Sequence, residues 1–162
     1  QEAYAIHPEY LQDVHRDQEA VNFADHGIQL TRGFRALKLW MTIQVFGMDG
    51  LAAAVTRGFE LAERAEAILR EGGSWRVLTP AQMAIVSFRW EAPGKTEEEL
   101  DRIQLGIVEG LKAGGYALAT STRLRGRTVL RLCTINPRTT EEDLRGTIAE
   151  MARPGREQSG IS

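Results

Sequence analysis

Thr31 and the basic residues that follow it have the types and spacing of an anion site. Thr31 opens a predicted helix, where its hydroxyl oxygen can cap the first turn and the free N–H groups attract a phosphate. Arg32, Arg35 and Lys38 recur at three-residue spacing, so they share one face of that helix. The positive end of the helix dipole adds to their charge. The pattern predicts an anion site, although a plain N-cap would use Thr31 in the same way.

Tyr10 is the other candidate for chemistry. A phenol has an ordinary pKa of about 10, so it keeps its proton at neutral pH and can donate it to a strong base. On residue chemistry alone, a surface tyrosine in a terminal segment is the simpler interpretation. Tyr10 is therefore a candidate general acid whose role depends on the rest of the chain.

Histidine and cysteine usage indicates no metal site. His7, His15 and His26 lack close cysteine or histidine partners at metal-binding spacing, so we assign no metal. The single cysteine, Cys133, cannot form an internal disulfide and lies in an apolar strand pattern, which predicts a buried structural thiol. A reducing cytoplasm fits this cysteine usage.

The composition is that of a folded globular chain, with 162 residues, 43% of them hydrophobic and 26% charged. The formal net charge of -2 gives no reason to expect nucleic acid or an anionic membrane as a partner. The apolar runs are short, and no charged-then-apolar leader opens the sequence. We therefore expect a soluble cytoplasmic protein without a membrane span.

The first half of the chain is predicted to form a loop and two helices. Residues 1–30 are polar with weak periodicity, which indicates a loop. A helix over 32–46 carries apolar residues on two faces, so we expect it to be largely buried. A second helix, over 50–71, has Asp49 as its cap, and the glycine pair that begins at Gly72 stops it.

After these helices the hydrophobic period changes to two, which is typical of strands. Thr96 and Glu99 form a capping box that predicts a further helix, and Arg125 with Gly126 predicts a hairpin turn. In order, the pattern predicts strands over 75–78 and 82–90, the helix after the capping box, strands over 116–122 and 128–135, and a helix over 141–152 capped by Thr140. The order ββαββα indicates an α+β fold, with a mainly antiparallel four-stranded sheet against helices.

Three separated segments carry a resemblance to one family: 7–11 (His-Pro-Glu-Tyr-Leu), 30–40 (Leu-Thr-Arg-Gly-Phe-Arg-Ala-Leu-Lys-Leu-Trp) and 130–140 (Leu-Arg-Leu-Cys-Thr-Ile-Asn-Pro-Arg-Thr-Thr). In order and spacing they resemble the group II pyridoxal-phosphate-dependent amino-acid decarboxylases, which include the aromatic-L-amino-acid, histidine and glutamate decarboxylases. The resemblance implies the C-terminal part of a fold-type-I enzyme. The family's cofactor-binding lysine, in a His-Lys pair, lies upstream of this chain, which has no such pair and begins with Gln1. We therefore expect a piece of a larger enzyme that is inactive without its lysine-bearing N-terminal part.

The resemblance also implies a domain plan. Residues 1–30 would hold the family's mobile catalytic loop and its lead-in, and residues 31–72 would form helices that link to the large domain and the dimer interface. Residues 73–152 would form the small C-terminal α+β domain, followed by a flexible tail over 153–162. The working unit would be a homodimer of the complete enzyme, with pyridoxal 5'-phosphate as cofactor and an amino acid as substrate.

Two site residues follow from the resemblance. Tyr10 matches the catalytic-loop position where a tyrosine supplies a proton after the loop closes and excludes water, and related enzymes with Phe there tend toward oxygen-dependent aldehyde formation. Thr31 matches a position that reaches across the dimer toward the partner's cofactor phosphate and substrate pocket. Two residues depart from the family pattern, since His26 stands where many members carry Trp and Gly33 replaces a second arginine. The loss of that arginine weakens the predicted basic cluster.

The leading hypothesis is therefore that this chain is a piece of a decarboxylase. The complete enzyme would convert an amino acid to its amine and CO2, and an aromatic amino acid is the best match. One alternative is a pyridoxal-phosphate-dependent aldehyde synthase on the same scaffold. Another is a non-catalytic α+β binding or regulatory module, which periodicity alone does not exclude.

Overall fold

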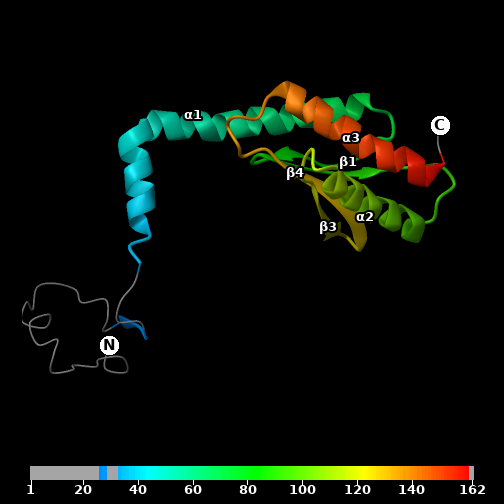
Figure 1. Cartoon of the computed structure of the whole chain (residues 1–162), viewed down its shortest axis with the longest axis horizontal. Coiled ribbons are helices and arrows are strands. Elements are labelled where there is room, and N and C mark those ends of the chain that lie inside the picture. Colours follow the sequence, from blue (N-terminus) through cyan, green and yellow to red (C-terminus); the bar gives the residue numbers. More distant parts are fainter. Residues whose placement is uncertain (1–25, 29–32, 161–162) are drawn as a thin grey trace, which may run out of the picture. The chain divides into compact units, whose positions relative to one another are not determined.

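The computed structural model describes residues 26–28 and 33–160 of the chain (Figure 1). The chain divides into two compact units, Gln1–Val45 and Phe46–Ser162. The second unit contains the whole sheet and two complete helices. The α+β class and the element order predicted after the first helices are confirmed.

Helix α1 (Ala36–Glu71) is interrupted at Gly47. The backbone there has φ 71° and ψ 170°, a conformation essentially restricted to glycine. The break divides α1 into two helical segments, as predicted, but it lies two residues before Asp49, which is itself helical and is not the cap of the second segment. The predicted start at residue 32 is also wrong, because a turn in which the Arg35 N–H donates to the Gly33 carbonyl (2.8 Å) precedes the helix. The low helix propensity of glycine accounts for this later start.

The four strands form one sheet in which every neighbouring pair is antiparallel. Their order across the sheet is β1 (Trp75–Gln82), β2 (Ile85–Trp90), β4 (Arg127–Cys133) and β3 (Thr120–Leu124). Strand β1 continues past its predicted end at residue 78 because Pro80 lies on an edge strand, where a missing N–H disrupts no inner ladder.

Two-residue turns with left-handed backbone close both hairpins. Arg125 and Gly126, with φ 51° and 81°, join β3 to β4 and confirm the predicted turn. Met83 and Ala84, with φ 48° and 60°, join β1 to β2 in a segment that was predicted to be strand. This conformation costs a residue other than glycine on the order of 1 kcal/mol or more. Contacts outside the turn must therefore maintain it.

Capping boxes begin the other two helices. In α2 (Glu97–Gly114), the Thr96 hydroxyl accepts from the Glu99 N–H, and the Glu99 carboxylate accepts from the Thr96 N–H, as predicted. In α3 (Glu141–Ser159), the predicted cap Thr140 makes the same exchange with Asp143. Both helix starts are therefore determined by local sequence.

Helix α3 extends to Ser159, so the flexible tail predicted to begin at residue 153 is wrong over 153–159. The Trp90 indole Nε1 donates to Ser159 Oγ at 2.8 Å. Gly155 lies directly against the Trp90 ring, where an added Cβ would approach to 2.8 Å. Pro154, the residue that favoured a helix end, lies inside the helix and is buried. These contacts with a distant strand hold the last turns in helical form.

One core lies between the sheet and all three helices (Figure 1). Its centre includes Trp75 and Trp90, whose rings meet edge to face at a centroid distance of 4.7 Å. Buried apolar residues of one cluster come from α1 (Leu61, Ala65, Ile68, Leu69), α2 (Leu100, Ile103, Ile107, Leu111), α3 (Leu144, Ile148, Met151, Ala152) and the sheet (Val86, Phe88, Leu130, Leu132). The helices therefore cover one face of the sheet. The later part of α1 belongs to this core, and the compact unit begins at Phe46, inside the segment 31–72 for which the resemblance implied a linking role.

The earlier part of α1 exposes apolar side chains around its whole circumference. The exposed large apolar residues up to the break and just after it are Phe34, Leu37, Leu39, Trp40, Met41, Val45, Phe46 and Met48. A helix that is apolar on every side is normally covered by other protein or by lipid. By length and composition alone α1 could cross a membrane, but its break at Gly47 would leave unpaired backbone groups in lipid. Cover by other protein is therefore favoured.

Candidate functional site

Tyr10 and Thr31, the two predicted site residues, lie outside the described residues 26–28 and 33–160. Their roles as proton donor and phosphate contact stay predictions. One part of the Thr31 prediction is wrong, because α1 begins only at Ala36 and Thr31 cannot be its N-cap. The predicted contact of Thr31 with a phosphate does not depend on that cap.

Two of the three predicted basic residues, Arg35 and Lys38, lie in the described part and are exposed near the start of α1. Neither side chain makes an ion pair with another described residue, whereas the Lys38 carbonyl accepts from the Thr42 hydroxyl at 2.7 Å. Both cations are therefore available to an anion. The third, Arg32, lies outside the described residues.

Lys95 lines a cavity among the described residues, and that cavity of about 190 Å³ is smaller than the ~300–1,000 Å³ usual for small-molecule sites. The Lys95 Nζ also lies 3.5 Å from the Glu99 carboxylate. The Lys95 cavity is therefore a poor match for a cofactor the size of pyridoxal phosphate.

A larger pocket of about 560 Å³ lies where β4 passes into α3. Its polar rim includes Cys133, Arg138 and Asp143. The prediction of a buried thiol is wrong, because Cys133 is exposed on the face of the sheet opposite the core. Hydrogen bonds from the Thr140 N–H and hydroxyl lower the pKa of Asp143, so this carboxylate is ionised at neutral pH and is committed to the helix cap. No described lysine reaches this pocket, which therefore lacks the group that would bind a carbonyl cofactor covalently.

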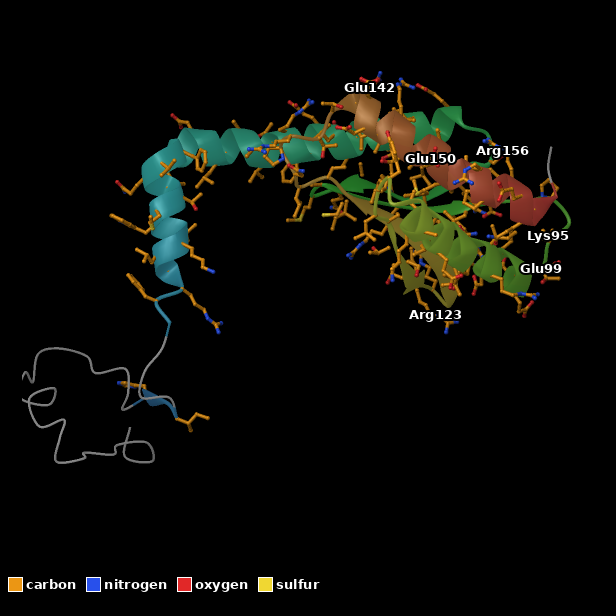
Figure 2. The ribbon with its side chains drawn as sticks, in the orientation of Figure 1. Lys95, Glu99, Arg123, Glu142, Glu150 and Arg156 are labelled. Atoms are coloured by element: carbon orange, nitrogen blue, oxygen red, sulfur yellow. The ribbon has the colours of Figure 1, made fainter. Side chains whose placement is uncertain are left out.

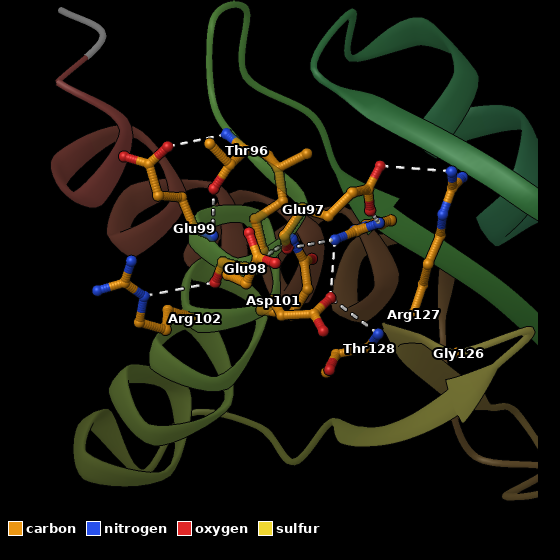
Figure 3. A network of polar contacts seen from close by, with 12 residues as sticks. Thr96, Glu97, Glu98, Glu99, Asp101, Arg102, Gly126, Arg127 and Thr128 are labelled. Atoms are coloured by element: carbon orange, nitrogen blue, oxygen red, sulfur yellow. Dashed lines mark hydrogen bonds and ion pairs between the residues drawn. The ribbon is translucent and has the colours of Figure 1, made fainter.

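A buried polar network lies at the N-terminal end of α2 (Figure 3). The Arg89 side chain is 1% exposed, and its guanidinium donates to Glu97 Oε2 at 2.7 Å and to Asp101 Oδ1 at 2.8 Å. Asp101 Oδ1 also accepts from the Thr128 N–H at 2.9 Å. Since strands β2 and β4 stop pairing beyond Phe88, Asp101 takes the place of a strand partner for the backbone of β4.

This network has a structural role. Both carboxylates are engaged by a guanidinium or a backbone amide, which leaves neither one positioned as a free general base. The sequence does not reveal this network, because alternation along β2 places Arg89 on the opposite side of the strand from Phe88 and Trp90, without indicating a partner. The one signal available in the sequence is the acidic start of α2, which carries Glu97 and Asp101.

A second ionic contact joins α1 to α3. The Glu141 carboxylate accepts from Arg64 Nη2 at 2.6 Å and from Arg145 Nε at 3.0 Å. The hydrogen bond from Arg64 is the main reason that the pKa of Glu141 falls to about 2. Other charged side chains, such as Glu142 and Glu150, lie along the outer surface of α3 (Figure 2). Among the described residues, no group of three or more His, Cys, Asp or Glu side chains is placed to hold a metal ion.

Comparison with known proteins gives a consistent picture. A family model described as the pyridoxal-dependent decarboxylase conserved domain matches residues 1–91. An aromatic-L-amino-acid decarboxylase of Bacillus atrophaeus is 39% identical over 144 residues, which cover 87% of this chain and 30% of the relative. Tryptophan decarboxylase 2 of Oryza sativa is 30% identical over 141 residues, covering 86% of this chain and 28% of the relative. The chain thus spans less than a third of the length of these relatives.

Solved structures agree in fold. The crystal structure of Oryza sativa TDC with PLP and tryptamine matches 98% of this chain and 33% of that chain, with a TM-score of 0.84 and 26% identity. The apo form of mouse CSAD matches 94% of this chain with a TM-score of 0.77, and at 18% identity it supports the fold alone.

Proposed function

This chain belongs to the pyridoxal-dependent decarboxylase family, and we propose that it is the C-terminal part of an L-amino-acid decarboxylase that uses pyridoxal phosphate. The observation that carries the proposal is the agreement of fold over nearly the whole chain, since 98% of it matches one third of a rice TDC solved with PLP and tryptamine. A fold shared at this level also supports the fold-type-I architecture.

The proposed substrate is an aromatic amino acid, and the proposed products are its amine and CO2. Relatives named for aromatic amino acids support this choice, among them the Bacillus aromatic-L-amino-acid decarboxylase and the rice tryptophan decarboxylase. The pocket residues that would discriminate one aromatic side chain from another belong mostly to the remaining part of the enzyme.

Tyr10 is the proposed proton donor. Pyridoxal phosphate, when bound, would supply the electron sink that makes loss of CO2 possible. The Tyr10 phenol holds a proton at neutral pH and would donate it to the substrate carbon from which CO2 has left. Closure of the segment around Tyr10 would exclude water, so that the phenol and not solvent supplies the proton.

Thr31 is proposed to contact the cofactor phosphate of the other subunit in a homodimer. The exposed cations Arg35 and Lys38 follow it on the same chain and would attract that phosphate.

The N-terminal part of the same enzyme is the proposed partner of this chain. Two observations support it: the chain spans less than a third of the length of two relatives, and the start of α1 exposes apolar residues on every side. We place the complete enzyme in the cytoplasm, and the single cysteine and small net charge of this chain are in keeping with that location.

An aldehyde synthase is the second candidate function. It is favoured by one relative, the phenylacetaldehyde synthase of Arabidopsis thaliana, which is 28% identical over 141 residues. The presence of Tyr10 favours simple decarboxylation, since the family resemblance associates Phe at that position with aldehyde formation.

The deciding experiment is native mass spectrometry of the complete enzyme, followed by product analysis with tryptophan, tyrosine and phenylalanine. The proposal expects a lysine-bearing part with covalently held pyridoxal phosphate, and stoichiometric amine and CO2. Aldehyde formed with oxygen consumption would establish the second candidate. A stable, cofactor-free protein that makes neither product would leave a binding module and refute the proposed activity.

A further inference from the structure

Four exposed apolar side chains gather at the end of the α+β unit where β1 turns into β2. They are Met83 at the turn, 74% exposed; Ile135 after β4, 71% exposed; and Val55 and Phe59 on α1, 56% and 40% exposed. We call these four residues the hairpin-tip patch.

Buried contacts around Gly58 hold the three segments of the patch together. The Thr134 hydroxyl donates to the Gly58 carbonyl at 2.8 Å, and the Thr134 N–H donates to the Ala84 carbonyl at 2.9 Å. An added Cβ on Gly58 would lie 3.3 Å from the Ala84 Cβ and 3.7 Å from the Ile135 Cα. Helix, hairpin and strand end thus meet in close packing, so the hairpin-tip patch is preformed.

Met83 and Ala84 are not the residue types that stabilise a turn of this kind best. Asn-Gly is the usual choice for a two-residue turn with left-handed backbone, yet this turn uses Met83 and Ala84, both at positive φ. Ala84 is explained by its buried place against Gly58. Met83 points its long side chain outward, and contacts within the unit do not account for it. Methionine adapts readily to a partner surface, which suggests that the partner lies outside this unit.

The size and charge of the patch decide which partner fits. A stable dimer interface requires about 800 Å² on each side, from roughly 20–30 residues. Four side chains are too few for that, so the patch fits better as one part of a larger contact within a single enzyme. A lipid surface would favour free basic residues at the rim, but the neighbouring Arg57 lies 3.7 Å from Glu60 in an ion pair. The chain spans only 30% and 28% of two relatives, which leaves a large remaining part available as cover.

We propose that the hairpin-tip patch docks the N-terminal, lysine-bearing part of the same enzyme, with Met83 as its central contact. This inference rests on the proposed function, which supplies that part. The left-handed Met-Ala turn is then maintained because it presents an adaptable apolar side chain to the docked surface.

Photo-crosslinking in the complete enzyme tests the proposal. Met83→p-benzoylphenylalanine places the probe at the patch, and Leu105→p-benzoylphenylalanine places it on an exposed apolar position of α2 outside the patch. After irradiation, peptide mapping of mixed isotope-labelled subunits identifies the linked residue and its chain. We expect position 83 to link to the N-terminal part and position 105 not to do so. Links from position 83 to lipid or to the α+β unit of a second copy, or equal linking from both positions, would overturn the proposal.

Methionine oxidation gives a second readout on the unmodified enzyme. Buried Met151 is the internal reference for the rate of sulfoxide formation. If the patch is covered, the rate of sulfoxide formation at Met83 should lie within about threefold of the rate at Met151. Oxidation of Met83 more than about tenfold faster than Met151 would show an open patch and contradict docking. An enzyme that holds the cofactor and makes amine while failing both tests would refute the docking alone. Absence of a lysine-bearing part would refute the proposed function as well.

Discussion

Gln104 of α2 replaces a neighbouring strand for both backbone groups of Trp90 in β2. Its side-chain oxygen accepts from the Trp90 N–H at 2.9 Å, and its side-chain nitrogen donates to the Trp90 carbonyl at 3.0 Å. One helical turn earlier, Asp101 does the same for the Thr128 N–H of β4. Helix α2 thus satisfies both strand edges where β2 and β4 separate.

Replacing Gln104 should destabilise the α+β unit. Gln104→Leu removes both bonds to the buried Trp90 backbone, and each unsatisfied group costs about 1–3 kcal/mol, so we expect a loss of about 2–6 kcal/mol in the free energy of unfolding. Urea unfolding measures the loss in unfolding free energy, and hydrogen exchange at the Trp90 amide measures the local effect. Gln82→Leu, at an exposed position, is the matched control and should change stability by less than about 0.5 kcal/mol. Equal effects of the two substitutions would contradict the role given to Gln104.

Two glycines in helices should respond oppositely to alanine. Gly155→Ala forces a methyl group against the Trp90 ring and should destabilise the unit by about 1–3 kcal/mol. Gly114→Ala, at the end of α2 with open space around it, should be neutral or stabilising by up to about 1 kcal/mol. Thermal unfolding of the two variants compares them directly, and a stabilised Gly155→Ala protein would show that the α3 packing described above is incorrect.

The Glu141 contact should make stability depend on pH at acid values. The pKa of Glu141 is about 2 in the folded state against an ordinary 4.5. Because the folded pKa is lowered, the stabilisation is fully present above pH 4.5 and is lost as pH falls toward 2. The difference in unfolding free energy between the wild type and Glu141→Gln should therefore shrink across that window. Glu142→Gln, at the neighbouring exposed position, is the control for the effect of removing one carboxylate on the free energy of unfolding. If the difference in unfolding free energy between the wild type and Glu141→Gln does not change with pH, the prediction is contradicted.

Tyr10 should control the product of the complete enzyme. A positioned general acid contributes about 10²–10⁴-fold to rate, so Tyr10→Phe should lower amine formation by at least about 10²-fold and favour aldehyde. Chromatography of the amine and aldehyde, with oxygen uptake, measures both products. Tyr4→Phe, close by in the sequence, is the control. Undiminished amine formation by Tyr10→Phe would remove Tyr10 from the mechanism.

Thr31 should affect cofactor retention without affecting the fold. Thr31→Ala should release pyridoxal phosphate faster, whereas Thr31→Ser, which keeps the hydroxyl, should retain it. The unfolding temperature of the apo enzyme should be the same for both variants, because Thr31 does not cap α1. Cofactor absorbance after dilution follows the release, and equal retention by the two variants would refute the phosphate contact.

Features with local causes could be predicted from the sequence. The capping boxes at Thr96 and Thr140 and the turn at Arg125 and Gly126 each depend on residues a few positions apart. The hydrophobic alternation likewise gave the four strands, and with them the antiparallel sheet.

Features with distant causes could not be predicted. Helix α3 continues past Pro154 because Trp90, far away in the sequence, packs against its last turns. The Met83 turn carries no turn signature, since its stability comes from contacts made by Ala84 with α1. Of the candidate site, residue types and spacing single out Thr31 and Tyr10, but their roles as phosphate contact and proton donor are implied by the family resemblance alone.

The different surroundings of the three tryptophans give the enzyme two separate optical reporters. Trp75 and Trp90 are buried in contact with each other, while Trp40 is exposed on the first part of α1. Indole fluorescence shifts to shorter wavelength when water is removed. Emission from Trp40 would therefore follow assembly with the rest of the enzyme, and emission from the buried pair would follow unfolding of the α+β unit. Replacing Trp40 by phenylalanine would separate the two signals.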